Sequence, residues 1–181
     1  MENVVVILYL IFLIAELTVE TLICRVNMKF AVQRWRAKKI PELFVGRIGQ
    51  KEYEKSVQYT LAQGRFEIGS SFYNAALNLL VLFGGVLPVC NEIARHAASS
   101  LPAHTEAVGI AFCITVGLLF TVMTLPVDLY STFVLEERFG FNKTNLKTFV
   151  LDKIKGLALG LLIGVPFLFG VLWLMQASGS L

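Results

Sequence analysis

Charged residues are scarce in this sequence: Lys, Arg, Asp and Glu make up 16% of its 181 residues, while 56% are hydrophobic. A soluble domain carries about 25% charged residues. This shortage excludes most soluble folds, and the high apolar content excludes a disordered chain. The few charges leave long uncharged stretches between them, which is typical of a membrane protein.

Cysteine is also scarce. The 3 cysteines are Cys24, Cys90 and Cys113. They are odd in number, far apart and without Cys-x-x-Cys spacing, so they predict neither a disulfide framework nor a zinc site.

Four apolar stretches are long enough to cross a bilayer, because its hydrocarbon core is about 30 Å thick and a helix rises about 1.5 Å per residue. We predict an all-α, polytopic membrane protein with one membrane domain over residues 1–181. Its four transmembrane helices are expected at about 4–24, 68–90, 107–127 and 156–175. A signal peptide is the alternative for the first stretch. It fits less well, since no basic residue precedes the stretch, two glutamates interrupt it and no small-x-small cleavage site follows.

The basic residues predict the orientation, since Lys and Arg near the ends of membrane helices stay in the cytoplasm. All of the 16 except Arg95 lie in the segments 25–67 and 128–155. Four crossings therefore place both segments in the cytoplasm and both termini outside. The basic cluster at 34–39 is interpreted as a topology signal with an interfacial tryptophan, rather than as a site for anionic lipid headgroups. The expected partner is the lipid bilayer, with no role for nucleic acid.

Polar side chains recur at helical spacing inside the expected crossings. Glu16 and Glu20 stand four residues apart in the first, so they share one helix face. An ionised carboxylate in hydrocarbon is costly, and we expect both to face inward. Similar stripes occur in the second and third crossings: Ser71, Asn74 and Asn78, and Thr121, Thr124, Asp128 and Ser131. Hydrogen bonds between helices would explain the amides and hydroxyls alone. The paired glutamates favour a wet cavity, lined by Glu16, Glu20, Asn74, Asn78 and Asp128.

The last crossing carries Gly156, Gly160 and Gly164, a small residue at every fourth position, which permits close approach of another helix. The third crossing is expected to continue past the membrane into a cytoplasmic elbow. There the helix stops near Gly140, which can adopt the left-handed conformation, and a new helix starts with Asn142 or Thr144 as its cap.

Residues 125–155, LPVDLYSTFVLEERFGFNKTNLKTFVLDKIK, resemble a stretch of the type I CAAX prenyl proteases that runs from Leu-Pro to Gly-Phe-Asn. The elbow residues in this motif are Glu136, Glu137, Gly140, Phe141 and Asn142. Weaker matches follow the family order: Glu20-Thr21-Leu22, Pro41-Glu42-Leu43, Tyr53-Glu54-Lys55-Ser56 with Tyr59, and Leu82-Phe83-Gly84-Gly85 with Pro88.

The resemblance implies the N-terminal membrane part of a zinc metalloprotease that cleaves prenylated proteins. In that family, helices form a wall around a water-filled chamber. The family binds zinc through His-Glu-x-x-His in a later part of the chain. Here the 2 histidines, His96 and His104, stand eight apart in an expected external loop, so no catalytic residue or metal ligand is transferred. We expect zinc only in the missing catalytic part, with this chain a fragment, a split form or a truncated form that needs the remainder as partner.

Two other functions remain open from the residues alone. One is a self-contained four-helix membrane scaffold or small channel, in which Glu16 and Glu20 serve ion passage or helix pairing. The other is a membrane-embedded hydrolase that uses Glu16, Glu20 and Asp128 as acid and base. Short loops and the lack of an added targeting segment favour a bacterial plasma membrane over the endoplasmic reticulum.

Overall fold

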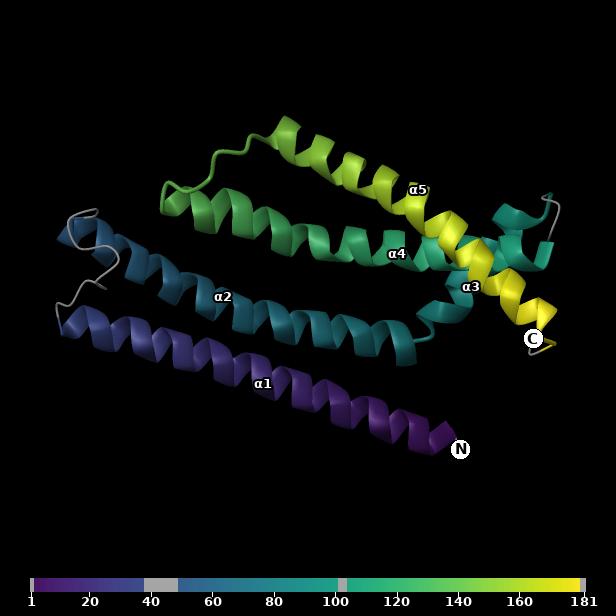
Figure 1. Cartoon of the computed structure of the whole chain (residues 1–181), viewed down its shortest axis with the longest axis horizontal. Coiled ribbons are helices and arrows are strands. Elements are labelled where there is room, and N and C mark those ends of the chain that lie inside the picture. Colours follow the sequence, from purple (N-terminus) through teal and green to yellow (C-terminus); the bar gives the residue numbers. More distant parts are fainter. Residues whose placement is uncertain (1, 38–48, 101–103, 180–181) are drawn as a thin grey trace. The chain divides into compact units, whose positions relative to one another are not determined.

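The structure is a computed structural model that describes residues 2–37, 49–100 and 104–179. These residues form helices and their connections, with no strand among them. Figure 1 labels the five α-helices, and a π-helix, η2, continues α4. In chain order the elements are α1 (Glu2–Arg36), α2 (Gln50–Phe83), α3 (Val86–Ala98), α4 (His104–Tyr130), η2 (Ser131–Glu136) and α5 (Leu146–Ala177).

The prediction of an all-helical chain with four membrane helices is confirmed. Four helical stretches in the described part are long and apolar enough to cross a membrane: Asn3–Arg36, Gln50–Phe83, Glu106–Glu136 and Leu146–Met175. Each is longer than the apolar stretch that predicted it, because charged residues continue the helix beyond the hydrocarbon core. The 13 residues of α3 are too few for a crossing.

The second expected crossing, 68–90, does not coincide with one helix. α2 ends at Phe83, and α3 begins at Val86. A Cβ atom on Gly84 would collide with the carbonyl oxygen of Leu80, and Gly85 has a φ of 74°, in the left-handed region that favours glycine. The two glycines thus break the helix within an uncharged run.

The described chain forms two compact units. The first comprises Met1–Asn78 and Val127–Asn142, which include α1, most of α2 and the elbow after η2. α1 and α2 run side by side in opposite directions (Figure 1). They approach closely at Gly64, where a Cβ atom would lie 2.9 Å from the Met28 side chain and 3.0 Å from Cys24 Sγ. Tyr53, Val57, Leu135 and Phe139 are buried in this unit.

The elbow ends the helix as expected. Gly140 has a φ of 65°. The carbonyl oxygen of Glu136 accepts hydrogen bonds from the backbone N–H groups of Phe139 (3.2 Å) and Phe141 (3.0 Å). The left-handed glycine predicted here is confirmed, and it satisfies carbonyl groups that the helix end would leave unpaired.

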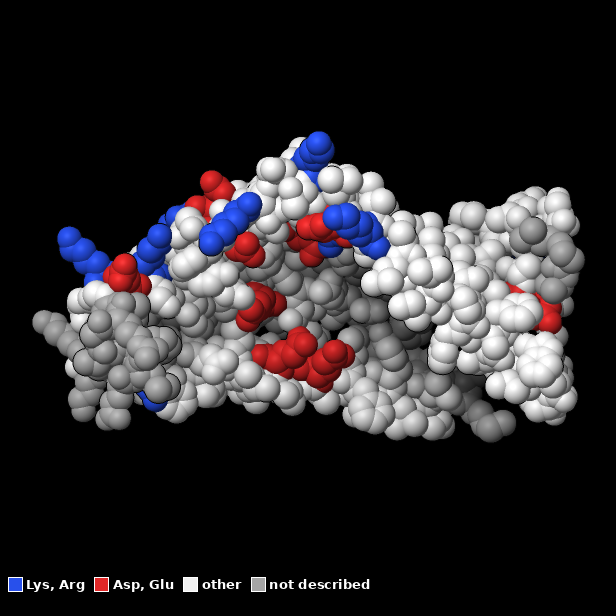
Figure 2. Space-filling model, turned by 45° about the horizontal axis from the view of Figure 1, so that its top comes forward, with Lys and Arg blue, Asp and Glu red and all other residues white. Residues whose placement is uncertain are grey.

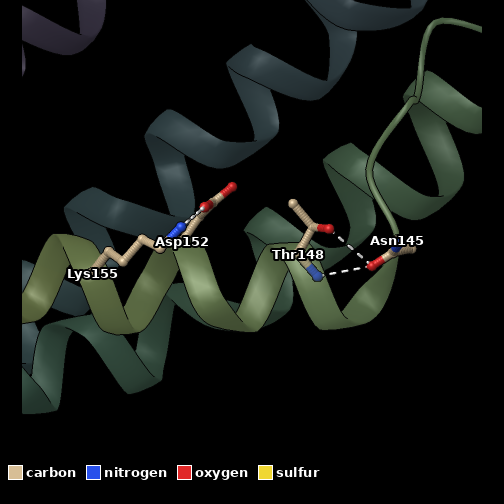
Figure 3. A network of polar contacts seen from close by, with 4 residues as sticks. All are labelled: Asn145, Thr148, Asp152 and Lys155. Carbon is tan, nitrogen blue, oxygen red and sulfur yellow. Dashed lines mark hydrogen bonds and ion pairs between the residues drawn. The ribbon is translucent and has the colours of Figure 1, made fainter.

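The second unit comprises Leu79–Pro126 and Lys143–Leu181, with α3, most of α4 and α5. The expected cap for α5 is wrong in position, because Asn145 is the cap. Its Oδ1 accepts hydrogen bonds from the Thr148 backbone N–H at 2.8 Å and the Thr148 hydroxyl at 3.0 Å (Figure 3). The side chain of Asn142 instead donates to the Glu137 carboxylate at 2.9 Å, within the first unit.

Large apolar side chains cover the outer faces of the long helices. Phe12 in α1 is 70% exposed, and Leu162 in α5 is 73% exposed. Water would not tolerate so much contiguous apolar surface, whereas the hydrocarbon core of a bilayer does. These helices therefore belong to an integral, multi-pass membrane protein. Two features of the sequence fall outside the described residues, Lys38 and Lys39 of the basic cluster and the Pro41-Glu42-Leu43 motif.

Candidate functional site

A polar groove runs along the contact between α1 and α2 in the first unit. It consists of three adjoining hollows of about 130, 300 and 190 Å³, which we call the α1–α2 groove. Glu20 lines the first and second hollows, and Cys24, Asn27 and Glu67 line the second and third. The shared residues place the three hollows next to one another in a row.

Helical periodicity explains why these side chains meet. The α1 side contributes Glu16, Glu20, Cys24 and Asn27, and the α2 side contributes Gly64, Glu67, Ser71, Asn74 and Asn78. Successive members within each set are three or four residues apart, which keeps them on one helix face. The structure therefore brings together Glu16, Glu20, Asn74 and Asn78, four of the five residues expected to line a cavity. The fifth, Asp128, belongs to α4 and is half-buried in the same unit.

The groove carries negative charge. Glu16, Glu20 and Glu67 line it, and none of the residues that line its three hollows is Lys or Arg. Glu67 is held in place, because its Oε1 accepts a hydrogen bond from Gln63 Nε2 at 3.0 Å. Figure 2 shows acidic side chains, in red, grouped near the middle of one face, with Lys and Arg side chains, in blue, above them and to their left. All three glutamates are exposed, and carboxylates on helices that cross a membrane call for water or a polar ligand beside them.

Two threonines outside this groove, Thr121 and Thr124, bond within their own helix. The Thr121 hydroxyl donates to the carbonyl oxygen of Gly117 at 2.8 Å, and the Thr124 hydroxyl donates to that of Phe120 at 2.9 Å. Threonines in membrane helices often satisfy their hydroxyl groups in this way. At these two positions, the polar stripe of the third crossing therefore uses its hydroxyl groups for hydrogen bonds within α4.

Glu67 and Cys24 are groove residues that the sequence reasoning missed. Glu67 lies just before the second expected crossing, 68–90, and it stands four residues before Ser71 and seven before Asn74. Cys24 lies four residues after Glu20. The same helical spacing that identified the stripes would have found both.

The elbow residues of the family motif pack on the first half of α2. The Tyr59 ring makes edge-on contacts with Phe139 (5.4 Å between ring centroids) and with Phe141 (4.7 Å). Lys55 Nζ lies 5.5 Å from the centroid of the Phe141 ring. Cation–π and aromatic contacts of this kind each contribute about 0.5–1.5 kcal/mol. They fix the elbow against α2.

Among the described side chains, no group of three or more His, Cys, Asp or Glu residues is placed to hold a metal ion. His96 lies exposed on α3. The groove can bind water and polar groups through its carboxylates and amides.

Comparisons with known proteins agree with the motif in the elbow. The family described as CAAX prenyl protease N-terminal, five membrane helices, matches residues 31–181. A CAAX prenyl protease 1 homolog from Arabidopsis thaliana is 32% identical over 143 residues, which cover 77% of this chain and 34% of that protein. CAAX prenyl protease 1 from Saccharomyces cerevisiae is also 32% identical over 143 residues, which cover 76% of this chain and 32% of that protein.

The fold is also similar to a solved structure. The crystal structure of Ste24p from S. mikatae matches with a TM-score of 0.76 and 30% sequence identity, over 92% of this chain and 38% of that one. The chain thus spans about a third of the length of the relatives it matches. Both relatives named above are eukaryotic, which gives no support to the expected bacterial membrane. The chain belongs to the CAAX prenyl protease N-terminal family.

Proposed function

We propose that this chain forms part of the wall of a water-filled proteolytic chamber, and that the α1–α2 groove faces the water. The observation that carries the proposal is the row of carboxylates and amides along the contact between α1 and α2, two helices that are long and apolar enough to cross a membrane. Glu16 and Glu20 face Asn74, Asn78 and Glu67 across the groove. A helix pair that faced only lipid would not place three carboxylates there.

Catalysis requires a further part of the protein. The 2 histidines in the sequence stand eight residues apart, whereas a His-Glu-x-x-His helix requires a spacing of four. The matched part of this chain covers about a third of the length of the relatives named CAAX prenyl protease 1. We infer that zinc, the water-activating glutamate and further membrane helices belong to that remainder, which is the partner of this chain.

The orientation belongs to the same proposal. Both termini lie outside, and the elbow with Glu136, Glu137, Gly140, Phe141 and Asn142 lies in the cytoplasm near the chamber mouth. The support is the Lys and Arg distribution, in which Arg95 alone is placed outside. Of the two membranes considered, the eukaryotic relatives favour the endoplasmic reticulum.

The test begins with the gene, which should encode or adjoin a frame that contains His-Glu-x-x-His. The 181-residue chain purified alone should bind no stoichiometric zinc and should not cleave a prenylated CAAX peptide. Co-expression with the zinc-binding part should produce cleavage. Stoichiometric zinc on the chain alone would contradict the proposal. So would ion conduction by the chain alone in planar bilayers, which is the behaviour of a self-contained channel.

A further inference from the structure

The short helix α3 stands between two helices that cross the membrane. Its 13 residues, Val86–Ala98, follow α2 after Gly84 and Gly85, and α4 begins six residues later at His104. Thirteen residues are too few for a crossing, while α2 and α4 are both long and apolar enough for one. A connection between two crossing helices lies near one surface of the membrane, and this places α3 there.

Three kinds of side chain divide the circumference of α3. Small residues four apart are buried: Cys90, Ala94 and Ala98. Val89 and Ile93, also four apart, are 59% and 51% exposed. The remaining side carries three exposed polar residues, Glu92, Arg95 and His96. Because a helix turns about 100° per residue, Arg95 lies about 160° around the axis from Ile93. One helix thus has a packed side, an exposed apolar side and an exposed polar side.

The depth of α3 can be measured along its neighbour α4. α3 lies beside the first half of α4 (Figure 1), where Leu87, Pro88 and Asn91 border a hollow of about 330 Å³ together with Phe112. Phe112 stands six residues after Glu106, the last charged residue before the uncharged run of α4, which is about 9 Å along the helix. The apolar side of an interfacial helix enters the boundary between headgroups and acyl chains by about 5–10 Å. The start of α3 therefore lies at the depth of such a helix.

An exposed tryptophan marks nearly the same level on α5. A Cβ atom on Gly109 would lie 2.9 Å from Leu172 Cδ1, so this part of α5 meets α4 three residues after Glu106. Trp173 follows Leu172 and is exposed. Tryptophan is enriched where the hydrocarbon core meets the headgroups. The charge on α4 and the tryptophan on α5 thus agree on where the membrane boundary lies.

The exposed apolar residues of α3 follow others that already face the bilayer. Three side chains at the end of α2 are exposed and belong to the same unit as α3: Leu80, Leu82 and Phe83. A membrane surface accommodates an apolar side and a polar side on one helix, because the first enters the acyl chains and the second stays in water. The bilayer is therefore the cover that fits both exposed sides of α3. The rival cover is a membrane helix from the remainder of the protein.

We propose that α3 is an interfacial helix, which lies along the membrane surface at the end of α4 opposite the elbow. Val89 and Ile93 enter the acyl chains, and Glu92 and Arg95 face the headgroups and water. The buried side holds α3 to its own unit. This contact with the lipid surface is separate from the α1–α2 groove and does not depend on protease activity.

Tryptophan fluorescence with brominated phospholipids tests the proposal, because bromine quenches only a tryptophan that comes into contact with it. The full chain, with its 2 tryptophans replaced by phenylalanine, is reconstituted in phosphatidylcholine vesicles. Ile93→Trp reports on the exposed apolar side of α3, and Arg95→Trp on the polar side is the matched control. Lipid brominated near the carbonyl end of its acyl chains should quench Ile93→Trp at least about twofold more strongly than Arg95→Trp.

The depth is calibrated with Leu162→Trp, at an exposed position in the middle of α5. Lipid brominated near the ends of its acyl chains should quench Leu162→Trp most strongly and Ile93→Trp only weakly. Val89→Trp should behave like Ile93→Trp, so the result does not depend on one variant, and far-UV circular dichroism checks that each variant stays helical. Equal quenching of Ile93→Trp and Arg95→Trp would overturn the proposal.

The rival cover is tested in the longer protein. A photo-crosslinking amino acid in place of Ile93, with the remainder of the protein co-expressed, should form adducts with lipid and none with the remainder. A crosslink from position 93 to the remainder would overturn the proposal, and so would the lack of any lipid adduct. Neither readout involves cleavage of a CAAX peptide, so a failure here is distinguishable from a failure of the proposed function.

Discussion

Cys24 on α1 donates its thiol hydrogen to the backbone carbonyl oxygen of Gly64 on α2, with 3.0 Å between sulfur and oxygen. This contact joins residues 40 positions apart in the sequence. It lies in the wall of the α1–α2 groove, where Cys24 and Gly64 line the same hollow. The width of the groove therefore depends on how closely the two helices approach at Gly64.

Replacing Gly64 with leucine should separate α1 from α2. Its Cβ atom would come within 2.9 Å of Met28 and 3.0 Å of Cys24 Sγ, and the larger side chain would extend farther. Overpacking of this kind costs about 1–3 kcal/mol. Unfolding of the detergent-solubilised protein by a denaturing detergent measures the loss.

The control for this substitution is Gly69→Leu. Gly69 lies on the same helix, and an added Cβ atom there would meet nothing within 4 Å. It should leave the free energy of unfolding nearly unchanged. An equal loss in both variants would mean that helix approach at Gly64 is not what stabilises the pair.

Gly140→Val should destabilise the elbow, because Gly140 has a φ of 65° and a β-branched residue is a strong outlier there. The expected cost is about 1–2 kcal/mol. Gly140→Asn is the matched control, since asparagine tolerates the left-handed region. The free energies of unfolding of the two variants are compared. Similar values for Gly140→Val and Gly140→Asn would contradict the left-handed backbone conformation at Gly140.

Asn145→Ala should fray the start of α5. It removes the acceptor for the backbone N–H of Thr148 at 2.8 Å, and loss of such a cap costs about 1 kcal/mol. Hydrogen exchange at the Thr148 amide should become faster, and Asn145→Ser should restore protection. If Asn142→Ala accelerated hydrogen exchange at Thr148 and Asn145→Ala did not, the cap of α5 would be Asn142, one of the two residues expected from the sequence.

The orientation makes a separate prediction. In a variant whose cysteines are replaced by serine, Lys143→Cys should react with a membrane-impermeant thiol reagent only from the cytoplasmic side. Ser178→Cys should react only from the opposite side. Both positions are exposed. Labelling of the two from the same side would exclude a four-crossing topology with both termini outside.

The sequence predicted the long helices well and their breaks less well. Long apolar runs identify crossings because hydrocarbon excludes charge, and this reasoning found all four, the first of them despite Glu16 and Glu20. It extended the second crossing over Gly84 and Gly85, since an apolar run does not itself distinguish one helix from two. It did find the stop at Gly140, where a single glycine follows charged, helix-forming residues.

The sequence predicted only part of the candidate site. Spacing within a helix placed Glu16 with Glu20 and Asn74 with Asn78 on shared faces, and the structure joins these faces in one groove. Spacing contains no information about which helices are neighbours. The spacing would have added Cys24 to the stripe with Glu20 and Glu67 to the stripe with Ser71, but the contact between the two stripes depends on the pairing of α1 with α2, which only the structure supplies. The sequence reasoning used no feature that would indicate the π-helix η2.

Water access to the α1–α2 groove tests the central claim most directly. Glu20→Cys, in the variant with serine at the native cysteines, reports on the groove. Val19→Cys is the control, because Val19 is 53% exposed on the apolar outer surface of the same helix. The thiolate that reacts forms only in water. In native membranes, a water-soluble thiol reagent should therefore modify Glu20→Cys on the order of tenfold faster than Val19→Cys. Equal rates, or faster reaction at Val19→Cys, would contradict a water-facing groove and with it a place in a chamber wall.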